Sequence, residues 1–167
     1  SMEEAMFRAK QFQERGGRQP FDWLVGTFYS GVAAAYEATG RVEFLDAARA
    51  WCASGDWTCG ERIPLNADAV CTAQTFLDVY FTDKDPKQIE QIDALFKKYY
   101  FGVDTIKREL LWGKGKNRGR AIWGQDETRP FLGRHLWWWC DSLYMAPPVM
   151  ARLGETTGDE RYYELLH

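Results

Sequence analysis

Apolar side chains recur along the chain at the three- and four-residue spacing of amphipathic helices. Between residues 28 and 39, for example, Phe28, Val32 and Ala35 fall on one helical face, and Gly40 then supplies a helix stop. No stretch alternates convincingly with the two-residue period of a strand. We therefore predict an all-α protein. The predicted helices cover residues 28–39, 43–53, 67–80, 85–100 and 141–157, and a sixth helix starts at residue 159.

These helices are predicted to form repeated hairpins. Segments 36–44 and 154–162 resemble each other, because in both a helix ends at Thr-Gly and the next opens with an acidic first turn. Residues 81–86 occupy the equivalent turn of the middle hairpin. Repeated helical hairpins indicate a stack or a ring. We expect residues 1–167 to be one partial domain, the first three hairpins of an (α/α)6 toroid, completed by a missing C-terminal half or a second chain.

Composition limits the class of protein further. A chain of 167 residues that is 46% hydrophobic can form one domain and bury roughly two-thirds of its unfolded surface. A net charge of −3 gives no global electrostatic footprint for nucleic acid, and no run of apolar residues is long enough to span a membrane. The 8 Trp, 8 Tyr and 10 Phe residues serve either a packed helical core or a sugar site, where aromatic rings stack on apolar sugar faces.

Cysteine and histidine positions do not favour a metal site. The four cysteines, at positions 52, 59, 71 and 140, form no Cys-x-x-Cys pair, and the two histidines are His135 and His167. We therefore expect no structural zinc site, and no metal or cofactor is needed for the chemistry considered below. Cys52 and Cys59 could form a disulfide in an oxidising compartment, but buried free thiols are the favoured interpretation.

Asp141 lies in the most informative stretch, residues 137–148, directly after Trp137, Trp138, Trp139 and Cys140. One interpretation makes Asp141 an N-cap that accepts backbone hydrogen bonds. The other makes it an acid/base carboxylate, because indole walls raise the pKa of a carboxyl group while a helix N-terminus lowers it. A carboxyl group with a pKa near neutrality can both donate and accept a proton.

Asp68 is a second acidic residue in the first turn of a predicted helix. Asn66 is a plausible N-cap of that helix, and Gln74 follows eight residues later. Asp68 either interacts favourably with the helix dipole or belongs to a site. Asp68 and Gln74 can face one cavity only from its mouth, because they do not lie on one stripe of the helix.

Residues 113–134 form a predicted connecting loop with six basic residues against two acidic ones. It is either a solvated connector or a lid that attracts an anionic sugar. In the second case Trp112 and Trp123 are stacking candidates. No phosphate-binding loop is present in this segment, since its glycines lack the required spacing.

Three segments of the sequence resemble the unsaturated rhamnogalacturonyl hydrolases of glycoside hydrolase family 105, relatives of the unsaturated glucuronyl hydrolases of family 88. These segments are residues 22–31, 66–80 and 138–153 with 157–159, and the string Trp-Cys-Asp-x-Leu-x-Met-Ala-x-Pro that begins at Trp139 is the most specific. The resemblance implies a ring of six α-hairpins. It places the catalytic acid/base on Asp141 and a second active-site aspartate on Asp68. Residues 66–71 depart from the close relatives, which often read His-Ala-Asp-Asp-His-Cys there.

The resemblance also implies a substrate and a reaction. The substrate is an oligosaccharide that ends in a 4,5-unsaturated galacturonyl or glucuronyl residue, and the terminal sugar leaves after hydration of its double bond. The resemblance implies a bacterial source, in the cytoplasm or the periplasm. A helical-toroid carbohydrate-binding or scaffold protein without turnover is the alternative. Candidate substrate-binding residues are Trp138, Trp139, Trp123, Arg134, His135, Asn66, Gln74 and Met145.

Overall fold

The computed structural model describes residues 1–17, 21–59, 66–101, 120–122, 130–132 and 140–166. Apart from one pair of short strands, the regular elements in these ranges are helical, which confirms the predicted class. In chain order they are α1 (Met2–Glu14), α2 (Trp23–Thr39), α3 (Val42–Ser54), α4 (Ala67–Asp83), α5 (Lys87–Phe96), the π-helix η1 (Lys97–Phe101), β1 (Arg120–Ile122), β2 (Pro130–Leu132), α7 (Ser142–Met145), α8 (Pro147–Thr157) and α9 (Arg161–Glu164).

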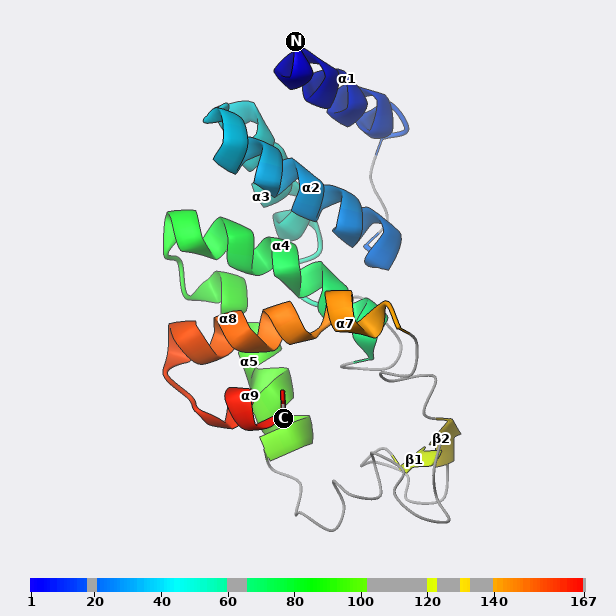
Figure 1. The fold of residues 1–167 in the computed structure, drawn as a ribbon, viewed down its shortest axis with the longest axis vertical. Coiled ribbons are helices and arrows are strands. Elements are labelled where there is room, and N and C mark those ends of the chain that lie inside the picture. The colour runs from blue at the N-terminus through cyan, green and yellow to red at the C-terminus, as the bar shows by residue number, and fades with distance from the viewer. Residues whose placement is uncertain (18–20, 60–65, 102–119, 123–129, 133–139, 167) are drawn as a thin grey trace.

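The helices are stacked along the long axis of the molecule, with α1 at one end (Figure 1). α2 packs against α3 and α4, and α4 also contacts α5, α7 and α8. α4 is therefore the central helix of the stack. β1 and β2 form an antiparallel pair in which Arg120 lies opposite Leu132. This pair falls in the segment predicted as a loop, because strands of three residues are too short to show a two-residue period.

Each of the three hairpins turns at a residue with a left-handed backbone conformation. The turns are at Gly40 with φ 69°, Lys84 with φ 59° and Gly158 with φ 71°. In each turn the backbone N–H donates to the carbonyl four residues earlier, over 2.8, 2.8 and 2.9 Å. Glycine is favoured in this conformation, and two of the three turns use it. The repetition in the sequence therefore corresponds to a repeated turn geometry.

Capping side chains define where two of the helices begin. α2 starts at Trp23, five residues before the predicted start, because Oδ1 of Asp22 accepts a hydrogen bond from the Val25 N–H at 3.0 Å. α4 starts at Ala67, as predicted, and Oδ1 of Asn66 accepts from the Ala69 N–H at 2.8 Å. The helix α1 was not predicted. It contains no fully buried residue, so its apolar stripe is weak.

Two predicted helices differ from the observed ones. The helix predicted for residues 141–157 is divided at Ala146 into α7 and α8. Pro147 and Pro148 cause this division, because proline has no backbone N–H and disfavours the helical conformation of the residue before it. The helix predicted for residues 85–100 starts at Lys87 and continues after Phe96 as the π-helix η1.

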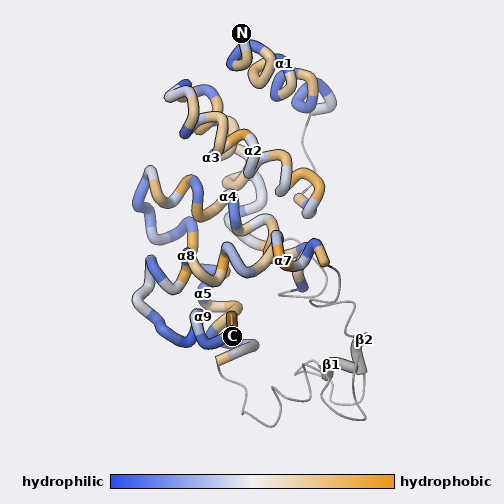
Figure 2. The backbone as a smooth tube through the Cα atoms, viewed as in Figure 1, coloured by the Kyte–Doolittle hydropathy of each residue, from blue (hydrophilic) through white to orange (hydrophobic). Residues whose placement is uncertain are grey.

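Aromatic residues make up much of the core between α2, α3 and α4. The Trp51 ring lies between the rings of Phe21 and Tyr29, with centroid distances of 4.5 and 4.7 Å, and Phe76 extends the stack. These side chains are used for packing, as the simpler interpretation of the aromatic content proposed. Along the longer helices, such as α4, hydrophobic positions are interleaved with hydrophilic ones (Figure 2).

All four cysteines are free thiols, and Cys52 and Cys71 are buried. This agrees with the favoured interpretation, and the alternative Cys52–Cys59 disulfide is not formed. Burial raises the pKa of the Cys52 thiol well above its usual range. Within the described ranges, no helix is both long enough and apolar enough to cross a membrane.

Candidate active site

Close packing of α2 on α4 brings the first turns of these two helices together. A side-chain carbon on Gly26 would lie 3.3 Å from Cα of Thr72, so only glycine allows this approach without displacement. Next to it, Oγ1 of Thr27 lies 3.6 Å from Sγ of Cys71. One turn further on, Oγ of Ser30 lies 3.4 Å from Oγ1 of Thr75. The N-terminal half of α4 is thereby fixed against α2.

Asp141 precedes α7 and is exposed to solvent. Its backbone is helical, with φ −66° and ψ −20°, and its side chain makes no capping hydrogen bond with the described part of the chain. Asp141 thus occupies the N-cap position of α7, but its side chain does not accept the hydrogen bond that the N-cap interpretation proposed. A residue whose side chain caps a helix typically has an extended backbone, as Asn66 does at ψ 161°. Within the described residues, the Asp141 carboxylate is therefore not engaged in capping α7.

Asp68 lies in the first turn of α4 and is partly buried. Burial raises the pKa of Asp68, and the negative charge of Asp141 raises it further. The second effect requires the two carboxylates to be close in space, although they are far apart in the sequence. α7, which follows Asp141, packs against α4, which carries Asp68, so the two predicted aspartates lie in the same region of the structure.

Two neighbouring carboxylates do not ionise independently, because like charges oppose each other. Asp68 therefore holds its proton to a higher pH than an isolated carboxyl group does. Such a pair can donate a proton to a reacting atom and stabilise positive charge that develops nearby. In the described part of the chain, no group of three or more His, Cys, Asp and Glu side chains is placed to bind a metal ion.

Three candidate substrate-binding residues lie within α4 and α7 or directly before α4. Oδ1 of Asn66 is engaged in capping α4. Gln74 is only 6% exposed, and its amide donates to the backbone carbonyls of Tyr144 at 2.7 Å and Met145 at 3.1 Å. Met145 is buried against Ala67 and Cys71. These contacts place Gln74 and Met145 in the interface between α4 and α7. The remaining candidates, Trp138, Trp139, Trp123, Arg134, His135 and Trp112, lie outside the described residues.

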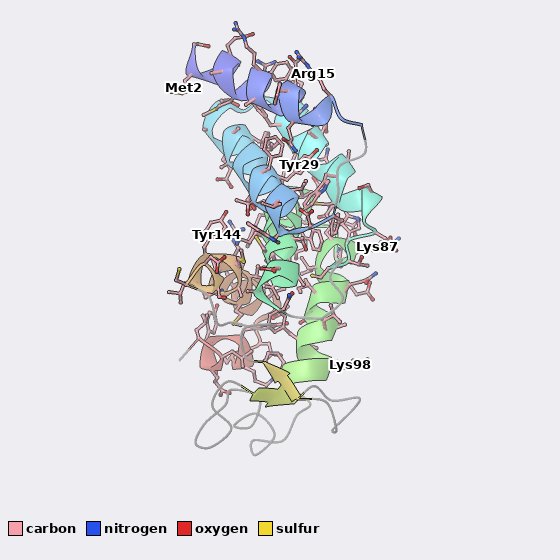
Figure 3. The ribbon with its side chains drawn as sticks, turned by 90° about the vertical axis from the view of Figure 1, so that its right-hand side faces the viewer. Met2, Arg15, Tyr29, Lys87, Lys98 and Tyr144 are labelled. Carbon is pink, nitrogen blue, oxygen red and sulfur yellow. The ribbon has the colours of Figure 1, made fainter. Side chains whose placement is uncertain are left out.

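Tyr144 and Cys71 also lie in this region, although neither was predicted from the sequence as a site residue. The Tyr144 side chain is 47% exposed, and its hydroxyl lies near Ser30 of α2. In Figure 3, Tyr144 lies on the side of α7 that faces α2. Burial raises the pKa of the Cys71 thiol, and the charges of Asp68 and Asp141 add to this effect, so the thiol stays neutral. The sequence could have indicated Tyr144, because it lies three residues after Asp141 and side chains at that spacing lie on the same face of a helix.

Apolar side chains are exposed at the start of α2 and in α7. Trp23 and Leu24 in the first turn of α2 are 37% and 61% exposed, and Leu143 of α7 is 77% exposed. Exposed large apolar residues next to a carboxylate pair are typical of a surface that binds a ligand with both apolar faces and polar groups.

The fold and the site define an all-α protein built of stacked helical hairpins, with two carboxylates near the N-termini of two adjacent helices. The chain belongs to Glycosyl Hydrolase Family 88, whose sequence profile matches residues 2–167. This agrees with the resemblance found in the sequence, which included family 88 among the relatives.

Two known proteins resemble the chain. An unsaturated 3S-rhamnoglycuronyl hydrolase from Formosa agariphila is 26% identical over 173 residues, which is 99% of this chain and 41% of the relative. The solved structure of a polysaccharide lyase superposes with a TM-score of 0.67 at 19% identity, covering 99% of this chain and 43% of that chain. The structural likeness concerns the fold alone. The chain thus spans about two-fifths of the length of each of these proteins.

Proposed function

We propose that the protein containing this chain removes a terminal 4,5-unsaturated uronic acid from oligosaccharides. The observation that carries the proposal is the packing of α7 against α4, which brings the charge of Asp141 near enough to Asp68 to raise the pKa of Asp68. Membership of Glycosyl Hydrolase Family 88 and the hydrolase from Formosa agariphila support a glycosidase that acts on unsaturated uronyl sugars. The sequence resemblance favours an unsaturated rhamnogalacturonyl substrate of the kind attributed to family 105.

The proposed reaction begins with hydration of the C4=C5 double bond, which is part of a vinyl ether. Asp141, in its protonated form, donates its proton to C4, and positive charge develops on C5 and the ring oxygen. A protonated Asp141 carries no charge and so does not oppose the ionisation of Asp68, and the nearby Asp68 carboxylate stabilises the developing positive charge. The Asp141 carboxylate then takes a proton from a water molecule, whose hydroxyl adds to C5. This step returns Asp141 to its protonated form.

The hydrated product is a hemiketal at C5. Its ring bond between C5 and the ring oxygen breaks, which leaves a ketone at C5 and frees the hydroxyl on C1. The resulting hemiacetal at C1 collapses to an aldehyde and releases the next sugar as an alcohol. The overall reaction consumes one water molecule. Cleavage therefore follows hydration, and the rules for a paired acid and nucleophile do not apply.

Loss of the ultraviolet absorbance of the double bond measures this reaction directly. Asp141→Asn in the full-length protein is expected to lower kcat on an unsaturated disaccharide by about 10²- to 10⁴-fold, the usual contribution of a general acid. Asp85→Asn is the matched control, because Asp85 is an exposed aspartate that caps the start of α5 at the other end of α4. The control should keep the parent rate. Full turnover by Asp141→Asn would remove Asp141 from the proposed role.

A carbohydrate-binding protein without turnover is the second candidate. Ala69 and Val70 are fully buried at positions where close relatives often carry Asp and His, so these positions contribute no polar side chain beside Asp68. Calorimetry with the same disaccharide separates the two functions. Binding by the parent protein with no loss of absorbance would select the second candidate.

A further inference from the structure

The division between α7 and α8 leaves backbone carbonyls without helical partners. In an uninterrupted helix the Tyr144 carbonyl would accept from the N–H of residue 148, but Pro148 has none. The Met145 carbonyl would accept from Val149, whose N–H donates to Ala146 instead, at 3.0 Å. Buried carbonyls without partners cost free energy. The Gln74 amide supplies a hydrogen bond to each of these two carbonyls.

Gln74 is well suited to hold α7 in place. It lies 70 residues away in the sequence, on the central helix α4, and it is 6% exposed. α7 has four residues, which form a single turn, and a single helical turn is unstable without tertiary contacts. The turn therefore depends on its anchors for its position.

A second set of contacts attaches α8, which follows the division at Ala146, to α4. Arg152 of α8 forms an ion pair with Asp78 of α4, and its guanidinium also donates to the Gln74 carbonyl at 3.4 Å. Asp78 is one turn beyond Gln74. α7 and α8 are thus both attached to one side of α4, on either side of Ala146.

We propose that Gln74 is a positioning residue for Asp141. By holding the carbonyls at the C-terminal end of α7, its amide fixes the turn that follows Asp141 and so sets the distance from Asp141 to Asp68. Asp68 and Gln74 are on one rigid helix, separated along its axis by about 9 Å at 1.5 Å per residue. The helix α4 therefore carries one carboxylate directly and places the other through Gln74. The catalytic consequence rests on the proposed function, but the placement does not.

The test compares two buried glutamines. Gln74→Met keeps the length and approximate volume of the side chain and removes both hydrogen bonds. Gln88→Met is the matched control, because Gln88 is 4% exposed and its amide donates to Asp83 at 2.9 Å, away from the site. A shift of about 1 Å in a catalytic group can reduce the rate about 100-fold. We expect kcat to fall by roughly 10- to 100-fold for Gln74→Met with a smaller change in KM, and Gln88→Met to keep both values.

An NMR titration of the Asp68 carboxyl carbon tests placement without turnover. In the parent chain, Asp141→Asn should lower the pKa of Asp68, because it removes a like charge. In the Gln74→Met background the same substitution should have a clearly smaller effect, whereas the Gln88→Met background should retain all of it. An undiminished effect of Asp141→Asn in the Gln74→Met background would overturn the proposal.

The two proposals fail in different ways. If the coupling depends on Gln74 but no variant turns over the disaccharide, the proposed function is wrong and the placement stands. Circular dichroism checks that each variant is folded. If Gln74→Met does not fold, Gln74→Asn replaces it in the titration, because its amide is one methylene too short to reach both carbonyls. A coupling equal to that of the parent in this variant would also overturn the proposal.

Discussion

Asp68 carries its carboxylate where both burial and a second carboxylate oppose ionisation. A group in this position is costly to the fold at neutral pH, and such costs are common at functional sites because activity and stability place different demands on a residue. Other charged residues of the protein are placed differently. Asp83, for example, receives hydrogen bonds from Arg49 and Gln88, and these contacts lower the pKa of its carboxyl.

Asp68→Asn is expected to stabilise the protein at neutral pH. The folded protein holds the Asp68 proton to a higher pH than the unfolded chain does, so folding becomes less favourable as the pH rises above the ordinary value of 3.8. Asparagine has no such dependence. Urea unfolding over a pH series should therefore show a higher free energy of unfolding for Asp68→Asn at pH 7, with the difference disappearing below pH 3.8. A variant less stable than the parent at pH 7 would contradict this pKa shift.

At the scale of single residues, the sequence predicted the two aspartates as site residues but not the partners of the polar residues near them. Asp141 and Asp68 could be predicted because each is an acidic residue at the start of a predicted helix, and the residues that flank it in the sequence supplied the rest of the motif. Gln74 could not be interpreted in this way. Its partners are carbonyls 70 and 71 residues away, which lack helical hydrogen bonds only because two prolines interrupt a helix. Side-chain type predicts that a buried glutamine has partners, but it does not say which they are.

The hairpin turns are the elements that the sequence predicted best, and they can be tested by substitution. Gly40 and Gly158 have positive φ values, where a Cβ atom costs about 1–2 kcal/mol. We expect Gly40→Ala and Gly158→Ala each to lower the free energy of unfolding by about 1 kcal/mol. Gly31 is the control, because it lies within α2 with open space around it. Gly31→Ala should raise the free energy of unfolding by about 0.5–1 kcal/mol.

Urea denaturation of the three variants at one pH provides this measurement. The opposite signs matter more than the magnitudes, since a general effect of added methyl groups would give all three variants the same sign. If Gly40→Ala were as stable as the parent, the left-handed turn would not be required for the hairpin.

Element boundaries were less predictable than the elements themselves. The start of α2 at Trp23 depends on the Asp22 cap, which the apolar period does not reveal. The division at Ala146 was missed because proline is acceptable in a first helical turn but not in a second one, and the helix was assumed to start at Asp141. Whether a proline is compatible with a helix thus depends on its position counted from the helix start, so an error in the assumed start changes the prediction. Local sequence patterns do not fix starts to that accuracy.

At the scale of the whole molecule, α4 connects the layers. It packs against α2 on one side and against α7 and α8 on another, and it carries both Asp68 and the Gln74 amide (Figure 1). The stacked order of the hairpins was predictable, because each hairpin has one apolar face and needs a neighbour to cover it. The position of Asp141 relative to Asp68 was not predictable from patterns, since it depends on how a single turn is attached to a helix from another hairpin.

The stacked arrangement leads to a prediction for the 167-residue chain on its own. Hairpins in a ring are covered on both sides, whereas the terminal elements of this stack are not, and large apolar side chains are exposed on them. These include Phe12 of α1 at 72%, Tyr163 of α9 at 40% and Leu166 at 39%. Because exposed apolar residues favour association, we expect the isolated chain to self-associate and to lack turnover until the remaining hairpins or a second chain cover these faces.

Light scattering over a concentration series, combined with the absorbance assay, measures both parts of this expectation. Phe12→Gln should weaken association if the α1 end of the stack is involved, because it replaces the most exposed aromatic side chain of that end with a polar one. Leu143→Gln offers a comparison at a side chain that is 77% exposed beside Asp141 rather than at an end of the stack. A stable monomer with full activity would contradict the expectation, because it would show that three hairpins form a complete site without the rest of a ring.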